Sequence, residues 1–273
     1  MTEALMTKGE MFRALHKPGD PFILANAWDA GSAKMLAALG APAIGTSSSA
    51  HAFTLGKPDG VTRDEALAHA QDLVAAVDVP VSGDWENGFG DDPDTCAETV
   101  RLAAEVGLAG ISIEDTVIGT GGSYDFDLSV ERIRAAAAAA RALPQDFFLL
   151  ARADGVLRRT YDVDEAMRRL QAFEAAGADG LYLILPPSLD DVARLCKTTH
   201  LPVNAIAAGP HARYTRADFA AIGVARISLG SALANATWRV IADAGHAMFN
   251  DGSFAHLTNG INGQQVNEML TQK

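Results

Sequence analysis

Basic residues are scarce in this chain of 273 residues. Lys and Arg together number 22 against 34 Asp and Glu, which gives a formal net charge of −12 at pH 7. Proteins that bind nucleic acid cluster Lys and Arg on the phosphates, and anionic membrane surfaces attract basic segments. We therefore expect neither nucleic acid nor a membrane surface as a partner.

Cysteine and long apolar runs are also rare. The only cysteines, Cys96 and Cys196, form neither a disulfide framework nor a zinc motif, and we expect buried thiols. No apolar run is long enough to span a bilayer. The first 17 residues lack the hydrophobic segment and cleavage site of a secretory signal, so the sequence predicts a cytoplasmic protein.

The chain is rich in one repeated unit: an Ala- and Leu-rich helix, a glycine and a short apolar strand. Examples are AKMLAALGAPAIGTSS, RLAAEVGLAGISIED, LQAFEAAGADGLYLIL and FAAIGVARISLG. Gly40, Gly107, Gly177 and Gly223 stand where a helix ends on a left-handed residue.

This pattern predicts eight strands, each followed by a helical segment, at residues 22–26, 43–47, 79–84, 110–115, 147–153, 180–185, 202–207 and 225–230. Short apolar strands that alternate with helices indicate a parallel sheet buried on both faces. Eight units favour a closed (β/α)₈ barrel, and no GxGxxG follows the first strand to support a dinucleotide-binding sheet. We expect one barrel domain over residues 1–273, with a C-terminal helical extension from about residue 250.

In such a barrel the active site lies where the strands end. Asp84 and Glu86 follow the third strand, and extended chain would direct both side chains the same way. The fourth strand ends in Glu114 and Asp115. Converging carboxylates repel one another unless a cation lies between them, and Mg²⁺ accepts such oxygen ligands. We predict a metal site at Asp84, Glu86 and Glu114.

Two further acids and an arginine extend this cluster. Arg152 and Asp154 end the fifth strand, and Asp59 lies in the loop after the second strand. An arginine there can bind a carboxylate with two parallel hydrogen bonds. Single acids at strand ends are often helix N-caps, but several acids on neighbouring strands with an arginine beside them favour a metal site.

Other polar residues at the same end of the predicted barrel are candidates for substrate contact. Ser47, Ser48 and Ser49 form either a carboxylate-binding loop or an ordinary serine-rich turn. Trp28 is expected as a pocket wall, and Asn204, in the seventh strand, as a further substrate contact. His51 and His211 have no discernible partner and are expected in the solvent or at the pocket rim.

The segment TVIGTGGSYDFD after the fourth strand is long and glycine-rich. It is either a lid that excludes water, with Gly119, Gly121 and Gly122 as its hinge, or a plain surface loop.

These motifs resemble the isocitrate lyase and phosphoenolpyruvate mutase superfamily over about residues 21–239. The most specific is DWENGFG after an apolar strand, similar to the family's D-x-[DE]-x-G-[FY]-G signature. LGKPDG, ISIED, LLARADG and GVARISLGSAL support it, in the family's order and spacing.

The resemblance implies Mg²⁺, with Mn²⁺ as a substitute, held by Asp84 directly and by Glu86 and Glu114 mostly through water. It places Asp59 near the metal, Arg152 on the substrate and Ser47 in the substrate-carboxylate loop, so that Arg152, Glu114 and Asp59 are the expected catalytic residues. It also implies a homodimer or homotetramer that exchanges a C-terminal helix. The family's chemistry is a 2-oxo carboxylate whose developing charge is stabilised by the metal.

The departures from the family pattern narrow the expected reaction. The lid lacks the Lys-Lys-Cys-Gly-His stretch of the isocitrate and methylisocitrate lyases, and it lacks the Lys and Asn of the phosphonate enzymes. We predict cleavage of a C–C bond in a small 2-oxo acid, by decarboxylation or by retro-aldol cleavage. Tyr124 and Asp125 are the only acid/base candidates in the lid. The alternatives are a phosphonopyruvate-type mutase or hydrolase, and a barrel that binds 2-oxo acids without turnover.

Overall fold

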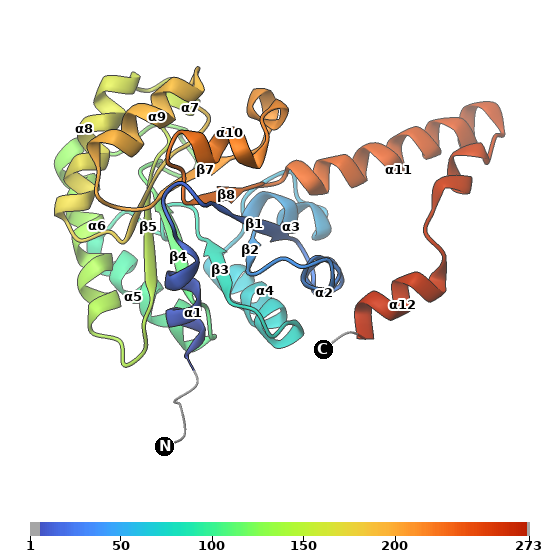
Figure 1. Cartoon of the computed structure of the whole chain (residues 1–273), viewed down its shortest axis with the longest axis horizontal. Coiled ribbons are helices and arrows are strands. Elements are labelled where there is room, and N and C mark those ends of the chain that lie inside the picture. Colours follow the sequence, from blue (N-terminus) through green and yellow to red (C-terminus); the bar gives the residue numbers. More distant parts are fainter. Residues whose placement is uncertain (1–5, 272–273) are drawn as a thin grey trace.

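Eight parallel strands close into a barrel in the order β1-β2-β3-β4-β5-β6-β7-β8 in the structure, a computed structural model that describes residues 6–271 (Figure 1). The strands are β1 Phe22–Ala27, β2 Ile44–Thr46, β3 Val81–Asp84, β4 Gly110–Glu114, β5 Phe148–Ala153, β6 Gly180–Leu183, β7 Val203–Ile206 and β8 Arg226–Ser228. All eight predicted strands are present, most of them shorter by one or two residues at an end. The predicted (β/α)₈ barrel is confirmed.

The helices surround the barrel, and most follow a strand directly. They are α1 Lys8–Leu15, α2 Ala30–Ala38, α3 Ser48–Thr54, α4 Arg63–Ala76, α5 Pro93–Glu105, α6 Phe126–Arg141, α7 Gly155–Arg158, α8 Val163–Ala175, α9 Leu189–Thr198, α10 Arg216–Ala221, α11 Ala232–Asp251 and α12 Gly263–Thr271. Two short 3₁₀ helices, η1 Gly209–Arg213 and η2 Ala255–Asn259, complete the set.

Local sequence sets the helix ends. Helix α4 begins with a capping box, in which the Thr62 hydroxyl accepts from the Glu65 N–H while the Glu65 carboxylate accepts from the Thr62 N–H. Helices α5 and α8 are followed by Gly107 (φ 93°) and Gly177 (φ 103°), which hold the predicted left-handed conformation.

Side chains alternate between two cores along each strand. On β5, Leu149 and Ala151 face the helices and belong to the large outer core, whereas Phe148 and Leu150 face the inside of the barrel. Arg152 follows on the inner face, two residues beyond Leu150. The same alternation therefore aims the polar residues at the strand ends into the barrel mouth.

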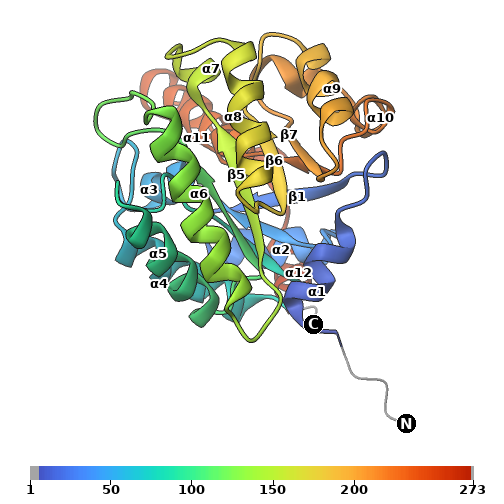
Figure 2. The same cartoon turned by 90° about the vertical axis from the view of Figure 1, so that its left-hand side faces the viewer.

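An aromatic cluster closes the base of the barrel, at the end opposite these polar residues. Phe12 of α1 is fully buried, and its ring meets the rings of Phe22 and Phe148 edge-on at centroid distances of 6.0 and 5.8 Å. Helix α1 packs near the amino end of β5 (Figure 2).

The C-terminal segment leaves the barrel as an arm. Helix α11 projects away from the barrel, and the chain then turns back so that α12 lies beside α2 (Figure 1). The arm exposes large apolar side chains: Trp238, Val240, Ile241, Phe249, Phe254, Leu257 and Ile261. The predicted helical extension is thus present. Across residues 6–271, no helix has the combined length and apolar character of a membrane span.

Candidate active site

The carboxyl ends of the strands surround a cavity of about 920 Å³. Its walls include Ser47, Ser48, Ser49, Asp59, Asp84, Glu86, Glu114, Arg152 and Asp154, together with residues of the segment after β4. The structure therefore brings five of the predicted acids, the arginine and the three serines to one cavity, as expected for the mouth of a (β/α)₈ barrel.

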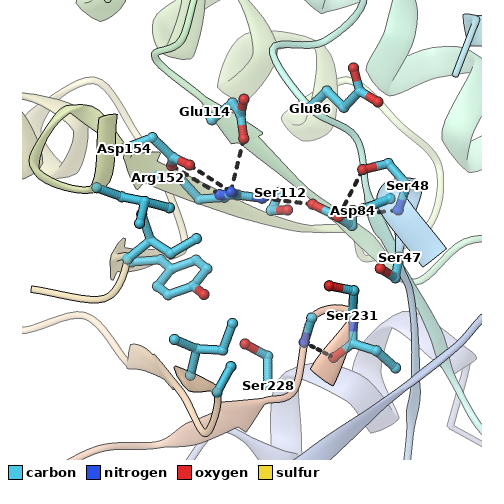
Figure 3. Close-up of a pocket in the computed structure, with 18 of the residues that line it drawn as sticks. Ser47, Ser48, Asp84, Glu86, Ser112, Glu114, Arg152, Asp154, Ser228 and Ser231 are labelled. Carbon is cyan, nitrogen blue, oxygen red and sulfur yellow. Dashed lines mark hydrogen bonds and ion pairs between the residues drawn. The ribbon is translucent and has the colours of Figure 1, made fainter. Parts of the chain in front are cut away.

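Arg152 is the centre of the charged cluster (Figure 3). Its Nη1 donates to Asp84 Oδ1 at 2.6 Å. Its Nη2 lies 2.8 Å from Glu114 Oε2 and 2.7 Å from Asp154 Oδ2, and its Nε donates to Asp154 Oδ1 at 3.1 Å. Burial alone would lower the pKa of Arg152, but the three carboxylates outweigh it and raise the pKa well above its usual value.

Asp84 is held from a second side by the end of β2 and the start of α3. The hydroxyl and the N–H of Ser48 donate to Asp84 Oδ2 at 3.2 and 3.3 Å, and the Asp84 N–H donates to Thr46 Oγ1 at 2.8 Å. Ser47 caps α3, its hydroxyl accepting from the Ala50 N–H. The serine segment is therefore the ordered start of a helix, with Ser48 directed toward the cluster (Figure 3).

Glu86 reaches the cavity by a different backbone path from the one expected. The sequence argument assumed extended chain through Asp84 and Glu86, and this is wrong: β3 ends at Asp84, and Glu86 has φ 45°, in the left-handed region. This conformation is disfavoured for a residue with a Cβ by about 1–2 kcal/mol. The DWENG turn nevertheless directs Glu86 into the cavity. Glu86 therefore lines the cavity together with Asp84 and Glu114, although the extended backbone assumed for it is not present.

The acids around Arg152 have more negative charge than one guanidinium balances. Burial, with Asp84 and Asp59 adding repulsion, raises the pKa of Glu86 to about 7, although its carboxylate accepts a hydrogen bond from the Val61 N–H. Burial and the neighbouring Asp154 raise the pKa of Glu114 well above its usual range. Buried acids with raised pKa values are a common mark of functional sites.

This donor set fits a hard divalent cation bound mainly through water. All the candidate ligands are carboxylate oxygens, which Mg²⁺ prefers. In the part of the chain that the structure describes, no three acidic, His or Cys side chains converge closely enough to chelate one ion directly. Mg²⁺ needs only one or two protein carboxylates and retains waters, so Asp84, Glu86 and Glu114 suit it without a closed cage.

The segment after β4 forms part of the cavity wall. It is pinned by an antiparallel bridge between Thr116 and Ser123, and it contributes to the lining Thr116, Val117, Ile118, Gly119 and Gly121. These residues carry no Cys, His or Lys side chain. The segment has the position and composition of a lid.

Tyr124 does not reach the cavity. It is buried against Arg132, whose guanidinium lies 4.0 Å from the ring centroid, and its hydroxyl donates to Asp91 Oδ1 at 2.5 Å and accepts from Asn87 Nδ2 at 2.7 Å. Burial and the bond to Asp91 raise the pKa of Tyr124 to about 12. The phenol is thus unsuited to the acid/base role considered for it. Asp125 precedes α6 as its N-cap residue, also outside the lining.

Other residues considered from the sequence lie outside the cavity wall. Asp115 turns away from the charged cluster, contrary to expectation. It accepts from the Tyr161 hydroxyl at 2.6 Å, from Arg169 Nη1 at 3.0 Å and from the Asp154 N–H at 2.9 Å. Its role is to anchor the end of β5. Trp28 and Asn204 are absent from the lining, and their contact with substrate stays a prediction.

The two histidines differ from the expectation as well. The ring of His51 stacks on that of His69 at 3.8 Å and 3°, a partner that the sequence did not reveal. His211 is buried beside Tyr214, neither in the solvent nor among the residues that line the cavity.

Two cationic residues that line the cavity were not predicted from the sequence. Arg158, on the short helix α7, lines the cavity beside the lid, and Arg226 of β8 lines it within the barrel. The signal for Arg226 was present in the sequence: a charged residue two positions before Ser228 in a short strand must share the inner face with that serine. No comparable signal marks Arg158.

The fold and the site together define a (β/α)₈ barrel enzyme whose mouth carries an acidic cluster around one arginine. The family model described as phosphoenolpyruvate phosphomutase matches residues 12–249. The chain therefore belongs to the phosphoenolpyruvate mutase and isocitrate lyase superfamily, as its motifs indicated.

Similar proteins in this superfamily include lyases. A crystal structure of a protein from Burkholderia cenocepacia J2315, provisionally assigned as a lyase/mutase, is 43% identical, with a TM-score of 0.93 and coverage of 97% of this chain and 96% of that one. The 2,3-dimethylmalate lyase of Eubacterium barkeri is 30% identical over 84% of this chain and 82% of its own length. An oxaloacetate decarboxylase of Pseudomonas savastanoi pv. phaseolicola is 28% identical over 78% and 75%.

Proposed function

We propose that this protein is a Mg²⁺-dependent lyase, with Mn²⁺ as a substitute, that cleaves a C–C bond of a small 2-oxo carboxylic acid. Decarboxylation is the reaction that the site favours. The observation that carries the proposal is Arg152, held among Asp84, Glu114 and Asp154 beside Glu86, under a lid without a Cys, His or Lys side chain.

The bound metal would supply Lewis-acid stabilisation of the negative charge that develops on the 2-oxo oxygen. Asp84, Glu86 and Glu114 are the residues that would hold it. Arg152 and the hydroxyl and N–H of Ser48 are the donors next to this position, so they bind and orient the substrate carboxylate. Val117 and Ile118 of the lid place apolar side chains over the cavity and exclude water.

The lid favours decarboxylation over retro-aldol cleavage. A retro-aldol reaction needs a base that removes the proton of a hydroxyl group, and the hydroxyl of Tyr124 is engaged outside the cavity with Asp91 and Asn87. Loss of CO₂ from a 3-carboxy-2-oxo acid needs only an electron sink. An intact acidic cluster under a lid without a general base suits that reaction.

Two of the similar proteins support cleavage of a C–C bond, and the decarboxylase among them supports loss of CO₂. One is named an oxaloacetate decarboxylase and the other a 2,3-dimethylmalate lyase. Both names describe cleavage of a C–C bond in a small carboxylic acid.

The decisive experiment is proton NMR of the purified protein with Mg²⁺ and a mixture of oxaloacetate, methylisocitrate, 4-hydroxy-2-oxo acids and phosphonopyruvate. Free Mg²⁺ itself promotes the decay of oxaloacetate, so EDTA and the Asp84→Ala variant serve as controls. Asp94→Ala is the matched substitution, because Asp94 is an exposed acid at the start of α5, outside the cavity. We expect loss of a 2-oxo acid with the wild type and Asp94→Ala, and not with Asp84→Ala.

The other outcomes identify the competing functions. Consumption of phosphonopyruvate alone would assign the protein to P–C chemistry and overturn the lyase. Line broadening without consumption of any compound would instead indicate a barrel that binds 2-oxo acids without turnover.

For the assembly, we propose a homodimer or homotetramer that exchanges the C-terminal arm α11–α12. The arm exposes Trp238, Ile241 and Phe249 at 45, 60 and 86%, and a projecting helix with an apolar surface is stabilised when a second subunit covers it. Light scattering of the purified protein tests the proposal, since a mass of 28.6 kDa would mean a monomer.

A further inference from the structure

Arg226 is a buried cation inside the barrel that the proposed chemistry does not use. The residue is 3% exposed and lines the cavity from β8. Its Nε donates to Asn204 Oδ1 at 2.8 Å, and Asn204 Nδ2 in turn donates to Ser228 Oγ at 3.0 Å. Asn204 thus fixes the plane of the guanidinium through one edge and leaves both terminal nitrogens to the cavity.

The two arginines of the cavity differ sharply in their partners. Arg152 is ion-paired with three carboxylates. Within residues 6–271, Arg226 has neither a carboxylate partner nor an aromatic ring beneath it, and Asn204 is its hydrogen-bond acceptor. Burial lowers the pKa of Arg226 to about 9, and the charge of Arg152 adds to this effect. A buried cation without a counterion is costly, so an anion at this position would stabilise the site.

Strand pairing connects the two arginines through the neighbouring strands β6 and β7. Arg152 pairs with Tyr182, Tyr182 with Asn204, and Asn204 with Arg226. Arg226 begins β8 and pairs with Phe22 of the barrel base, whereas Arg152 lies near the end of β5. Arg226 is therefore the deeper of the two.

Small side chains leave room between the two levels. Gly45, Ser82, Ser112 and Ser228 all line the cavity from the inner faces of their strands. They offer hydroxyl groups and space rather than a packed apolar layer. A passage lined by these residues suits a short polar ligand.

We propose that Arg226 binds the second carboxylate of a dicarboxylic substrate whose 2-oxo carboxylate end lies at Arg152 and Ser48. The proposal rests on the proposed function for the position of that first end. It assigns specificity to Arg226 and a positioning role to Asn204, which does not itself line the cavity. The substrate class is narrowed from 2-oxo acids to 2-oxo diacids.

The test compares ligands that differ in one terminal group. Isothermal titration calorimetry, with Mg²⁺ present, measures binding of 2-oxoglutarate against 2-oxopentanoate, which have the same chain length but end in a carboxylate and a methyl group. Malate and 2-hydroxybutanoate form the shorter pair, because oxaloacetate itself would be consumed by the proposed lyase during the titration. We expect the wild type to bind a diacid at least tenfold more tightly than its monoacid partner. Arg226→Met should abolish this preference and leave the monoacid affinity within about twofold.

Arg226→Lys keeps the charge but loses the planar fork, so it should retain part of the preference. It also keeps the test decisive if the methionine variant does not fold, which thermal unfolding without ligand would reveal. Equal binding of both members in each pair by the wild type, or an equal loss for both in the variants, would overturn the proposal. A preference that depends on Arg226 but comes without turnover would leave this inference standing and remove only the lyase.

Discussion

The stacked pair His51 and His69 makes a quantitative prediction about stability and pH. His69 is 6% exposed on the inner face of α4, and its Nε2 is buried without a hydrogen-bond partner among the described residues. Burial, with repulsion from His51 adding to it, lowers the pKa of His69 to about 4. The unfolded chain has a histidine pKa of about 6.5.

The sign follows from proton binding. Between these two pKa values the unfolded state binds the proton and the folded state does not, so stability falls as the pH falls. The contribution is fully present above pH 6.5 and is lost progressively toward pH 4. The whole shift corresponds to roughly 3 kcal/mol, of which about 2 kcal/mol is lost between pH 7.5 and pH 5.0.

Replacing His69 with Gln removes the titrating ring at this position. Urea unfolding at pH 7.5 and pH 5.0, at one protein concentration, measures the free energy of unfolding of each form. The wild type should lose about 2 kcal/mol more than His69→Gln over this interval. His200→Gln, at an exposed position, is the matched control and should behave as the wild type. An equal loss in the wild type and in His69→Gln would refute the reasoning.

Three further predictions concern the site, the lid and the arm. Arg152→Lys should lower kcat/KM roughly 100-fold or more in steady-state kinetics, because a lysine cannot hold three carboxylates and about 3 kcal/mol is lost; a loss under fivefold would contradict its central place. Tyr124→Phe should keep kcat within about threefold and lower the Tm by a few degrees, since the hydrogen bonds to Asp91 and from Asn87 are both lost. A tenfold fall in kcat would restore the phenol as a proton donor. Ile241→Asp should reduce the mass seen by light scattering toward 28.6 kDa, whereas the exposed Asn250→Asp should not; unchanged mass in both would count against arm exchange.

Most of the fold was predictable because its signals are local. Short apolar strands and glycines at helix ends, such as Gly107 and Gly177, depend on neighbouring residues alone, and eight such units favour closure. The acids of the site were predictable because strand ends in this fold converge. Their conformations were not: the left-handed turn at Glu86 depends on packing that the sequence pattern does not express.

The unpredicted features depend on contacts between distant segments. Tyr124 is turned outward by Arg132, Asn87 and Asp91, which lie 8, 37 and 33 positions away from it in the chain. Asp115 forms an ion pair with Arg169 of α8 and does not join the acidic cluster at the barrel mouth. Side-chain direction at such positions is decided by tertiary competition for hydrogen bonds, so a motif identifies the residue but not its orientation.

The aromatic base of the barrel has a consequence for the order of events in catalysis. Phe12, Phe22 and Phe148 close the end of the barrel opposite the lid. The cavity therefore opens to solvent only on the lid side. Cleavage of one molecule gives two fragments that leave through the same opening, so one fragment must depart before the other. Turnover is then an ordered release, and the fragment released last should act as a competitive product inhibitor, while the fragment released first should not.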